Sequence, residues 1–175
     1  MRRENALVVV LHNIRSAHNV GSIFRTADTA GVSKIILSGY TPSLTDPRGK
    51  IRKEFVKVSL GAEKTVPYST SKQLAPVLRR LKKDGYEIVA IEQDSRAKSL
   101  FEFKPKQKIA VVLGNEVRGL SAPALTLCDR VLEIPMHRAM VRQAHHPRHT
   151  RRGKESLNVS VAAGIALFHL TRRLK

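Results

Sequence analysis

Five short runs rich in valine and isoleucine constrain the fold of this 175-residue chain more than any other feature. The runs are Ala6–Leu11, Lys34–Leu37, Glu87–Ile91, Ile109–Leu113 and Arg130–Ile134. Several of them do not alternate apolar with polar residues, which is typical of strands that are covered on both faces of a sheet. Such strands require helices on either side of them.

Segments with helical spacing lie between the predicted strands. Apolar residues recur at i, i+3, i+4 and i+7 in two stretches, formed by Val20, Ile23, Phe24 and Ala27 and by Leu74, Val77, Leu78 and Leu81. The alternation predicts an α/β fold with a mostly parallel sheet flanked by helices. The length fits a single domain spanning residues 1–175.

The last predicted helix, Leu157–Leu170, is apolar almost all round. Its main interruptions are Asn158, Ser160, Gly164 and His169. A surface helix should present one polar face, so this helix is either central to the core or half covered by a second subunit. We favour the second interpretation, which predicts a homodimer.

The charge of the chain indicates a polyanionic partner. Lysine and arginine number 32 against 14 aspartate and glutamate residues, for a formal net charge of +18. Nucleic acid is the leading candidate and an anionic membrane the second, but no apolar run approaches the roughly 20 residues of a membrane-spanning helix. Aromatic residues make up only 5% of the chain and tryptophan is absent, so charge and shape should supply most of the binding.

The expected location is the cytoplasm. The N-terminal residues before the Ala6–Leu11 run lack the apolar length and the cleavage site of a secretory signal. A single cysteine, Cys128, agrees with a reducing compartment.

The loop after the first predicted strand, residues 12–21, is polar. It holds one glycine and therefore lacks the Gly-x-Gly-x-x-Gly fingerprint of dinucleotide sites. Asn19 stands at the predicted helix start and Arg25 lies on the polar side of that helix. On spacing alone, Asn19 could simply cap the helix and Arg25 could be a solvated surface arginine.

Two further segments carry candidate ligand-binding residues. In residues 113–121, Gly114 and Gly119 have the spacing of a phosphate-binding loop, but the lysine that should follow is absent. Glu116 could bind a hydroxyl, an amine or an arginine, or could form a surface salt bridge. In residues 155–160, small polar side chains precede the apolar helix and could cap it or hold the polar edge of a ligand.

Two further segments of the chain are strongly basic. Four histidines, His137, His145, His146 and His149, lie in one stretch without a nearby carboxylate or cysteine, so no metal site is expected there. A cluster of cations, Arg48, Lys50, Arg52, Lys53 and Lys57, is either a solvated face or a contact for a phosphate backbone.

Taken together and in order, four stretches resemble the motifs of SpoU-type RNA 2′-O-methyltransferases of the SPOUT superfamily. They are residues 13–31 (NIRSAHNVGSIFRTADTAG), 113–120 (LGNEVRGL), 134–136 (IPM) and 156–160 (SLNVS). The resemblance covers essentially the whole chain. It implies a deep trefoil knot near the C-terminus, bound S-adenosyl-L-methionine, and a homodimer formed through the motif-one and C-terminal helices.

The resemblance also implies roles for individual residues. The catalytic set would be Arg25, Asn19, Glu116, Ser156 and Asn158, with Arg25 activating the ribose hydroxyl. The cofactor would lie against Leu113, Gly114, Asn115, Ile134, Met136, Leu157 and Asn158. The RNA would contact Arg15, His18, Arg25, Arg48, Arg52 and Arg118. An arginine is an unusual base because its pKa is above about 12, so Arg25 could instead stabilise the developing alkoxide.

The chain departs from the family pattern in a basic insertion at about residues 137–152, inside the expected cofactor loop. Polar insertions in surface loops cost little free energy, and we expect this one to be tolerated or to grip RNA. The leading hypothesis is therefore methyl transfer to a ribose 2′-hydroxyl of tRNA or rRNA. The alternative is a non-catalytic RNA-binding or ribosome-associated protein whose cofactor site is impaired.

Overall fold

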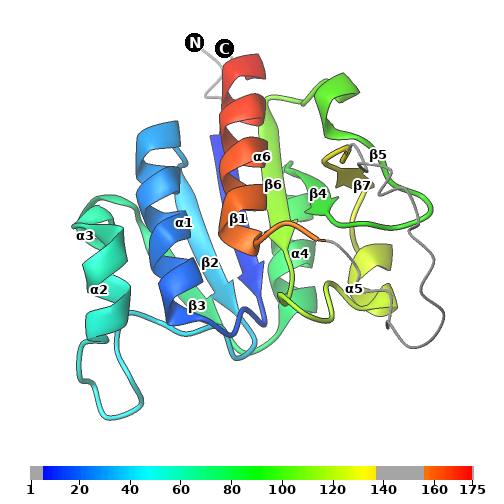
Figure 1. Ribbon diagram of the computed structural model, residues 1–175. Helices are drawn as coiled ribbons and strands as arrows, with labels where there is room; N and C mark the ends of the chain where they lie inside the picture. The colour runs from blue at the N-terminus through cyan, green and yellow to red at the C-terminus, as the bar shows by residue number, and fades with distance from the viewer. Residues whose placement is uncertain (1–5, 137–155, 175) are drawn as a thin grey trace, which may run out of the picture.

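The computed structural model describes residues 6–136 and 156–174, which form one seven-stranded sheet with helices on both faces (Figure 1). The strands are β1 (Ala6–His12), β2 (Lys34–Ser38), β3 (Tyr68–Ser71), β4 (Glu87–Ile91), β5 (Lys98–Ser99), β6 (Lys108–Leu113) and β7 (Arg130–Glu133). The helices are α1 (Ala17–Ala30), α2 (Lys53–Ser59), α3 (Ala62–Thr65), α4 (Leu74–Lys83), α5 (Ala122–Thr126), α6 (Val159–Arg173) and the 3-10 turn η1 (Leu100–Glu102). The strand order is β3-β2-β1-β6-β4-β7-β5, and every pairing is parallel.

The central strand β1 shows why both faces of the sheet need helices. Leu7, Val9 and Leu11 point into an apolar cluster shared with α1 and α6, while Val8 and Val10 point into a second cluster shared with α4 and α5. Figure 1 shows α1 and α6 side by side over one face and α4 and α5 behind the other. The burial of successive residues on opposite faces explains the unalternating apolar runs of the sequence.

Helix α1 is fixed at both ends and along one side. The Ser16 hydroxyl accepts a hydrogen bond from the Asn19 backbone N–H, and Gly31 ends the helix with a φ of 76°. Gly21 allows α2 to pack closely, because a Cβ there would lie 2.6 Å from the Phe55 carbonyl oxygen. Since Ser16 is the cap, the alternative interpretation of Asn19 as the helix cap is wrong.

The strand order reverses between β1 and β6. From β1 the chain proceeds outward to β2 and β3, whereas β6 is followed on the other side by β4, β7 and β5. In open α/β sheets, ligands bind outside the carboxyl ends of the strands at such a reversal. The loops after β1 and β6 therefore begin at the place where a site is expected.

The predicted α/β class is confirmed, and all five predicted strands are present within a residue or so of their expected ends. The short strands β3 and β5 and the short helices α2, α3 and α5 were not predicted. The insertion at 137–152 and the four histidines within it lie outside the described residues. The predicted knot depends on the path of this same segment and stays a prediction.

Candidate functional site

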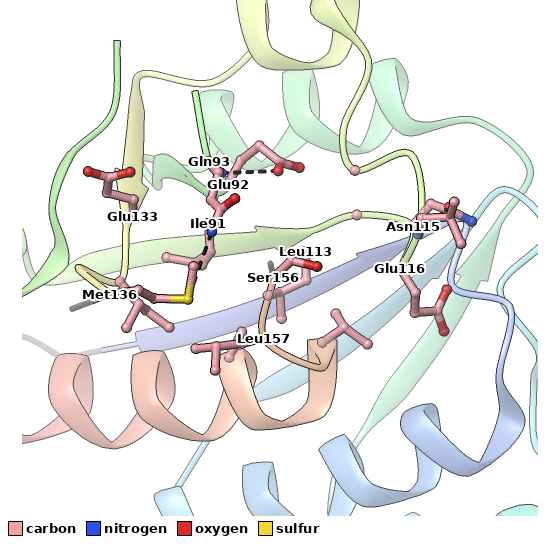
Figure 2. Close-up of a pocket in the computed structure, with 16 residues that line it drawn as sticks. Ile91, Glu92, Gln93, Leu113, Asn115, Glu116, Glu133, Met136, Ser156 and Leu157 are labelled. Carbon is pink, nitrogen blue, oxygen red and sulfur yellow. Dashed lines mark hydrogen bonds between the residues drawn. The ribbon is translucent and has the colours of Figure 1, made fainter. Parts of the chain in front are cut away.

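A pocket of about 380 Å³ opens at the carboxyl ends of β4, β6 and β7, beside the start of α6 (Figure 2). Its volume is within the range of small-molecule sites. The lining residues are Ile91, Glu92 and Gln93 after β4, Leu113, Gly114, Asn115, Glu116, Val117 and Gly119 after β6, Glu133, Ile134 and Met136 after β7, and Ser156, Leu157, Val159 and Ala162 at the α6 start. Every predicted cofactor residue except Asn158 lines this pocket.

Close backbone packing shapes the pocket wall after β6. A Cβ on Gly114 would lie 2.8 Å from the backbone of both Gly119 and Leu120, and a Cβ on Gly119 would collide with the Glu92 carboxylate. That carboxylate accepts hydrogen bonds from the Leu120 N–H at 2.8 Å and the Gln93 N–H at 3.0 Å. Glu92 thus joins the loops after β4 and β6, and its bond to Gln93 is drawn in Figure 2.

Next to the pocket lies a group of hydrogen-bonded side chains, here called the polar cluster, formed by Asn19, Glu116 and Asn158. Asn19 Nδ2 donates to Glu116 Oε1 at 3.0 Å, and Asn158 Nδ2 donates to Asn19 Oδ1 at 3.3 Å. Glu116 also accepts the backbone N–H groups of Arg15 at 2.9 Å and Ser16 at 3.2 Å. The cluster therefore connects the starts of α1 and α6 to the loop after β6.

The environment of Glu116 favours its charged form. Burial raises the pKa of its carboxyl group, but the hydrogen bonds donated by the Arg15 N–H, the Asn19 amide and the Ser16 N–H outweigh burial and bring the pKa below its ordinary value of 4.5. Glu116 forms no ion pair with any described residue, so a surface salt bridge does not account for it. A carboxylate that accepts three N–H groups is suited to hold other groups in place rather than to take up a proton.

Asn115 connects the pocket to the end of β2. Its Nδ2 donates to the Asn13 carbonyl oxygen and to the Tyr40 hydroxyl oxygen, both at 3.0 Å. Its Oδ1 accepts the backbone N–H groups of Val117 and Arg118, both at 2.9 Å. All polar atoms of this buried amide are therefore used to fix the loop.

Asn158 has two functions at the start of α6. It is the N-cap, because its Oδ1 accepts the Ser160 N–H at 2.8 Å, and its Nδ2 belongs to the polar cluster. The capping that the sequence offered as one alternative is therefore present, and the other alternative, contact with the polar edge of a ligand, stays a prediction. Ser156 lies two residues earlier, exposed and on the pocket wall.

The predicted cationic residues lie outside the polar cluster. Arg25 is exposed on α1, and among the described residues no hydrogen bond or ion pair joins its guanidinium to the three cluster side chains. The side chains of Arg15, His18 and Arg118 are also exposed near the same loops, and Arg48 is exposed after β2. Arg52 is half buried, with Nη1 3.9 Å from Glu54 Oε1. The structure therefore joins Asn19, Glu116 and Asn158 by hydrogen bonds, and Arg25 is not part of this network.

Two parts of the site were missed by sequence reasoning. The residues after β4, Ile91 to Gln93, form one wall, and Tyr40 reaches Asn115 from the end of β2. The signal for Glu92 was available, since it is the first polar residue after a predicted parallel strand. Tyr40 carried no comparable signal, because its contact depends on the pairing of β1 with β2 and β6.

The described ranges 6–136 and 156–174 contain neither a candidate membrane-spanning helix nor a cluster of metal ligands. No helix there is long and apolar enough to cross a membrane. Within the same ranges, no group of three or more histidine, cysteine, aspartate or glutamate side chains could hold a metal ion.

Comparison with known proteins gives a family match over most of the chain. A model described as the SpoU rRNA Methylase family matches residues 6–142. Among curated relatives, the 23S rRNA (guanosine-2′-O-)-methyltransferase RlmB of Ralstonia nicotianae is 33% identical over 167 residues, covering 95% of this chain and 59% of the relative. The protein of the same name from Burkholderia sp is 34% identical over 173 residues, covering 97% of this chain and 60% of the relative. The chain thus spans about 60% of the length of these relatives.

Solved structures of two methyltransferases superimpose on nearly the whole chain. The SpoU methyltransferase AviRb from Streptomyces viridochromogenes superimposes with a TM-score of 0.76 at 28% identity, covering 98% of this chain and 61% of that one. An AdoMet-bound rRNA methyltransferase from Sinorhizobium meliloti superimposes with a TM-score of 0.78 at 28% identity, covering 99% of this chain and 58% of that one.

Proposed function

The chain belongs to the SpoU rRNA methylase family, and on this premise we propose that it transfers a methyl group from S-adenosyl-L-methionine to a ribose 2′-hydroxyl of tRNA or rRNA. The observation that carries the proposal is the contact between the pocket and the polar cluster. Glu116 belongs to both, and Ser156 on the pocket wall is two residues from Asn158 of the cluster. A donor in the pocket would therefore lie beside a set of side chains able to orient an acceptor.

The pocket residues fit the proposed cofactor. Leu113, Ile134 and Leu157, which line the pocket, offer apolar side chains to an adenine ring. The Glu92 carboxylate has lone pairs left for ribose hydroxyls, since each oxygen accepts one described N–H. When bound, S-adenosyl-L-methionine supplies an electrophilic methyl group on a sulfonium.

The protein must then align a weakly nucleophilic hydroxyl and help remove its proton. Asn19 is held on both sides of its amide, by Glu116 and by Asn158, so its orientation is fixed before substrate binds. Glu116 already accepts the N–H groups of Arg15, Ser16 and Asn19, so we assign it to positioning Asn19 rather than to removing the proton. Arg25 is exposed on α1, and a guanidinium offers five N–H donors. We assign it to stabilising the developing alkoxide and the adjacent phosphate.

The RNA substrate is supported by the charge and by its distribution. The net charge is +18, and the exposed arginines Arg15 and Arg118 lie on the loops that frame the site. Phosphate contacts of this kind release counterions, so RNA affinity should fall steeply between low and moderate salt. A cytoplasmic location fits such a substrate and a chain with one cysteine.

A homodimer formed through the α1 and α6 helices is also proposed. Val159, Ala163 and Leu167 bury one side of α6 in the core, but Val161 and Phe168 remain 49% and 45% exposed. Exposed apolar side chains along one helix face are typical of an interface. In the proposed homodimer, a second copy of the chain covers Val161 and Phe168.

The experiment that tests the proposed function compares two chains, the intact one and one in which residues 137–152 are replaced by a short link. S-adenosyl-L-methionine binding is measured by calorimetry, and methyl transfer to ribosomal and transfer RNA is followed with a labelled methyl group. Alkaline digestion locates the product, because a 2′-O-methyl group blocks cleavage at that linkage. We expect both chains to bind the cofactor and the labelled linkage to resist alkali.

The alternative function, RNA binding without catalysis, rests on the position of the insertion directly between the pocket residues Met136 and Ser156. It predicts that only the trimmed chain binds the cofactor while both chains bind RNA. Absence of cofactor binding to either chain at millimolar concentration would refute the methyltransferase proposal.

A further inference from the structure

Tyr40, directly after β2 and Gly39, is the most exposed aromatic residue in the described part of the chain, with 61% of its surface accessible. The rings of Phe24 and Phe55, by contrast, are fully buried against each other. Burying an aromatic ring is favourable because it removes apolar surface from water, and an exposed ring does not contribute this free energy to folding. Its exposure at this position therefore calls for a function other than core packing.

The ring is held rigidly although it is exposed. The Tyr40 N–H donates to Asn13 Oδ1 at 3.2 Å, and the hydroxyl at the other end of the ring accepts from Asn115 Nδ2 at 3.0 Å. The turn that presents it is equally fixed, since Gly39 has a φ of 68° and a Cβ there would collide with Asn13 Oδ1. A ring fixed at both ends loses little conformational freedom when a ligand covers its face.

The location of Tyr40 relates it to the proposed reaction. The strands β2, β1 and β6 are neighbours in the sheet, so the residues that follow them, Tyr40, Asn13 and Asn115, lie together at the carboxyl ends of the strands. The pocket lies on the β4 and β7 side of β6, and Tyr40 lies on the opposite side, at the end of β2. Glu116 of the polar cluster directly follows Asn115 in the chain, so the cluster also lies where the strand order reverses between β1 and β6.

We propose that Tyr40 is a stacking platform for an RNA base that neighbours the methylated nucleotide. The inference rests on the proposed function, because it takes the acceptor ribose to lie at the polar cluster. A nucleotide there would have its chain neighbour within reach of the ring. Every base has a π face, so such a platform holds single-stranded RNA with little sequence preference.

Two substitutions separate stacking from a structural role. Tyr40→Phe keeps the ring but loses the bond from Asn115, whereas Tyr40→Leu loses both. Stacking predicts that Tyr40→Leu raises the KM for RNA by about tenfold or more, while kcat and cofactor affinity change less than about twofold. Tyr40→Phe, which keeps the ring, should raise the KM much less than Tyr40→Leu. Tyr86→Leu, a half-buried tyrosine at the amino end of β4, is the matched control. Equal damage from Tyr40→Phe and Tyr40→Leu would overturn the proposal.

A second measurement does not depend on activity. The chain holds no tryptophan, so Tyr40→Trp introduces a single fluorescent indole at the proposed platform. We expect its emission to be quenched when a single-stranded oligoribonucleotide is added, and unchanged by S-adenosyl-L-methionine alone.

The two proposals fail in different ways. Binding of the oligonucleotide, followed by anisotropy of a labelled end, without quenching of the indole would overturn the stacking role while leaving the proposed function intact. If the chain bound neither the oligonucleotide nor the cofactor, the proposed function and the stacking role would both be wrong.

Discussion

Asn19 Nδ2 donates a 3.0 Å hydrogen bond to Glu116 Oε1, although the two residues are 97 positions apart in the chain. The bond joins the first turn of α1 to the loop after β6, and it exists because β1 and β6 are neighbours in the sheet. Asn158, at the start of α6, completes the cluster. The predictions below follow from this arrangement and from the pocket beside it.

Glu116→Gln should impair methyl transfer more than folding. A glutamine replaces one acceptor oxygen by a donor that faces the N–H groups of Arg15, Ser16 and Asn19. Hydrogen bonds to a charged group contribute roughly 1.5–3 kcal/mol, so the rate should fall by about 10- to 100-fold. Single-turnover transfer of a labelled methyl group measures the effect. Glu54→Gln, in an exposed 3.9 Å ion pair, is the control and should leave the rate unchanged.

The pH dependence of stability should reveal the lowered pKa of Glu116. A carboxyl group whose folded-state pKa is depressed stabilises the fold above its unfolded pKa, and this contribution is lost as the pH falls through the folded pKa. The difference in unfolding free energy between the unsubstituted chain and Glu116→Gln should therefore be constant near neutral pH and shrink below about pH 4.5. Urea unfolding at a series of pH values measures it. A difference that grew as the pH fell would contradict the assignment.

Gly119→Ala should weaken cofactor binding, whereas Gly49→Ala should not. The two glycines have similar φ values, 65° and 77°, so an alanine costs about 1–2 kcal/mol of conformational energy at either position. Only at Gly119 would the new Cβ displace the Glu92 carboxylate, because nothing lies within 4 Å of a Cβ at Gly49. Calorimetric titration with S-adenosyl-L-methionine checks this, and equal affinities for the two variants would exclude a role of Glu92 in the pocket.

Arg25→Ala should lower kcat without affecting stability. The side chain is exposed on α1, so its removal should change the unfolding free energy by less than about 0.5 kcal/mol. Loss of a cation that stabilises developing charge typically costs roughly 100-fold or more in rate. Arg79→Ala, on the exposed side of α4 across the sheet, is the matched control. Unchanged kcat in Arg25→Ala would remove this residue from the reaction.

Phe168→Asp should dissociate the proposed homodimer. A carboxylate on the exposed apolar side of α6 could not be buried against a second copy without a large desolvation cost. Sedimentation velocity should show the unsubstituted chain at twice the mass of the variant. Ile51→Asp, at another exposed apolar residue far from α6 in the sequence, should keep the mass of the unsubstituted chain.

The sequence predicted the parts of the fold that depend on local pattern. The strands β1, β4 and β6 are continuous apolar runs, and α1 and α4 have clear helical spacing, so period and composition were sufficient. The strand β3, Tyr68–Ser71, is polar and lies at the edge of the sheet, where it needs no apolar residues. The two-residue strand β5 is too short to produce any periodicity.

The motifs named residues that lie together in the structure, whereas residues brought in by strand pairing were missed. Leu113, Met136 and Leu157, which the family resemblance assigned to the cofactor, line one pocket, and their contact with the cofactor stays a prediction. The wall at Glu92 and the contact of Tyr40 with Asn115 depend on the order of strands in the sheet, which local pattern does not reveal. Arg25 was predicted from its motif position, and its role remains a prediction.

The long separation between the members of the polar cluster also governs when the site comes into existence during protein synthesis. A growing chain that has not reached Asn158 lacks the donor to Asn19 Oδ1, and until α6 is made, Phe24 and Ala27 of α1 lack part of the cluster in which they are buried. Pairing of β1 with β6 likewise waits for about 100 residues of intervening chain, which is typical of slowly formed contacts. The site of a nascent chain is therefore incomplete until Asn158 has been made, and the polar cluster closes only once α6 packs onto the sheet.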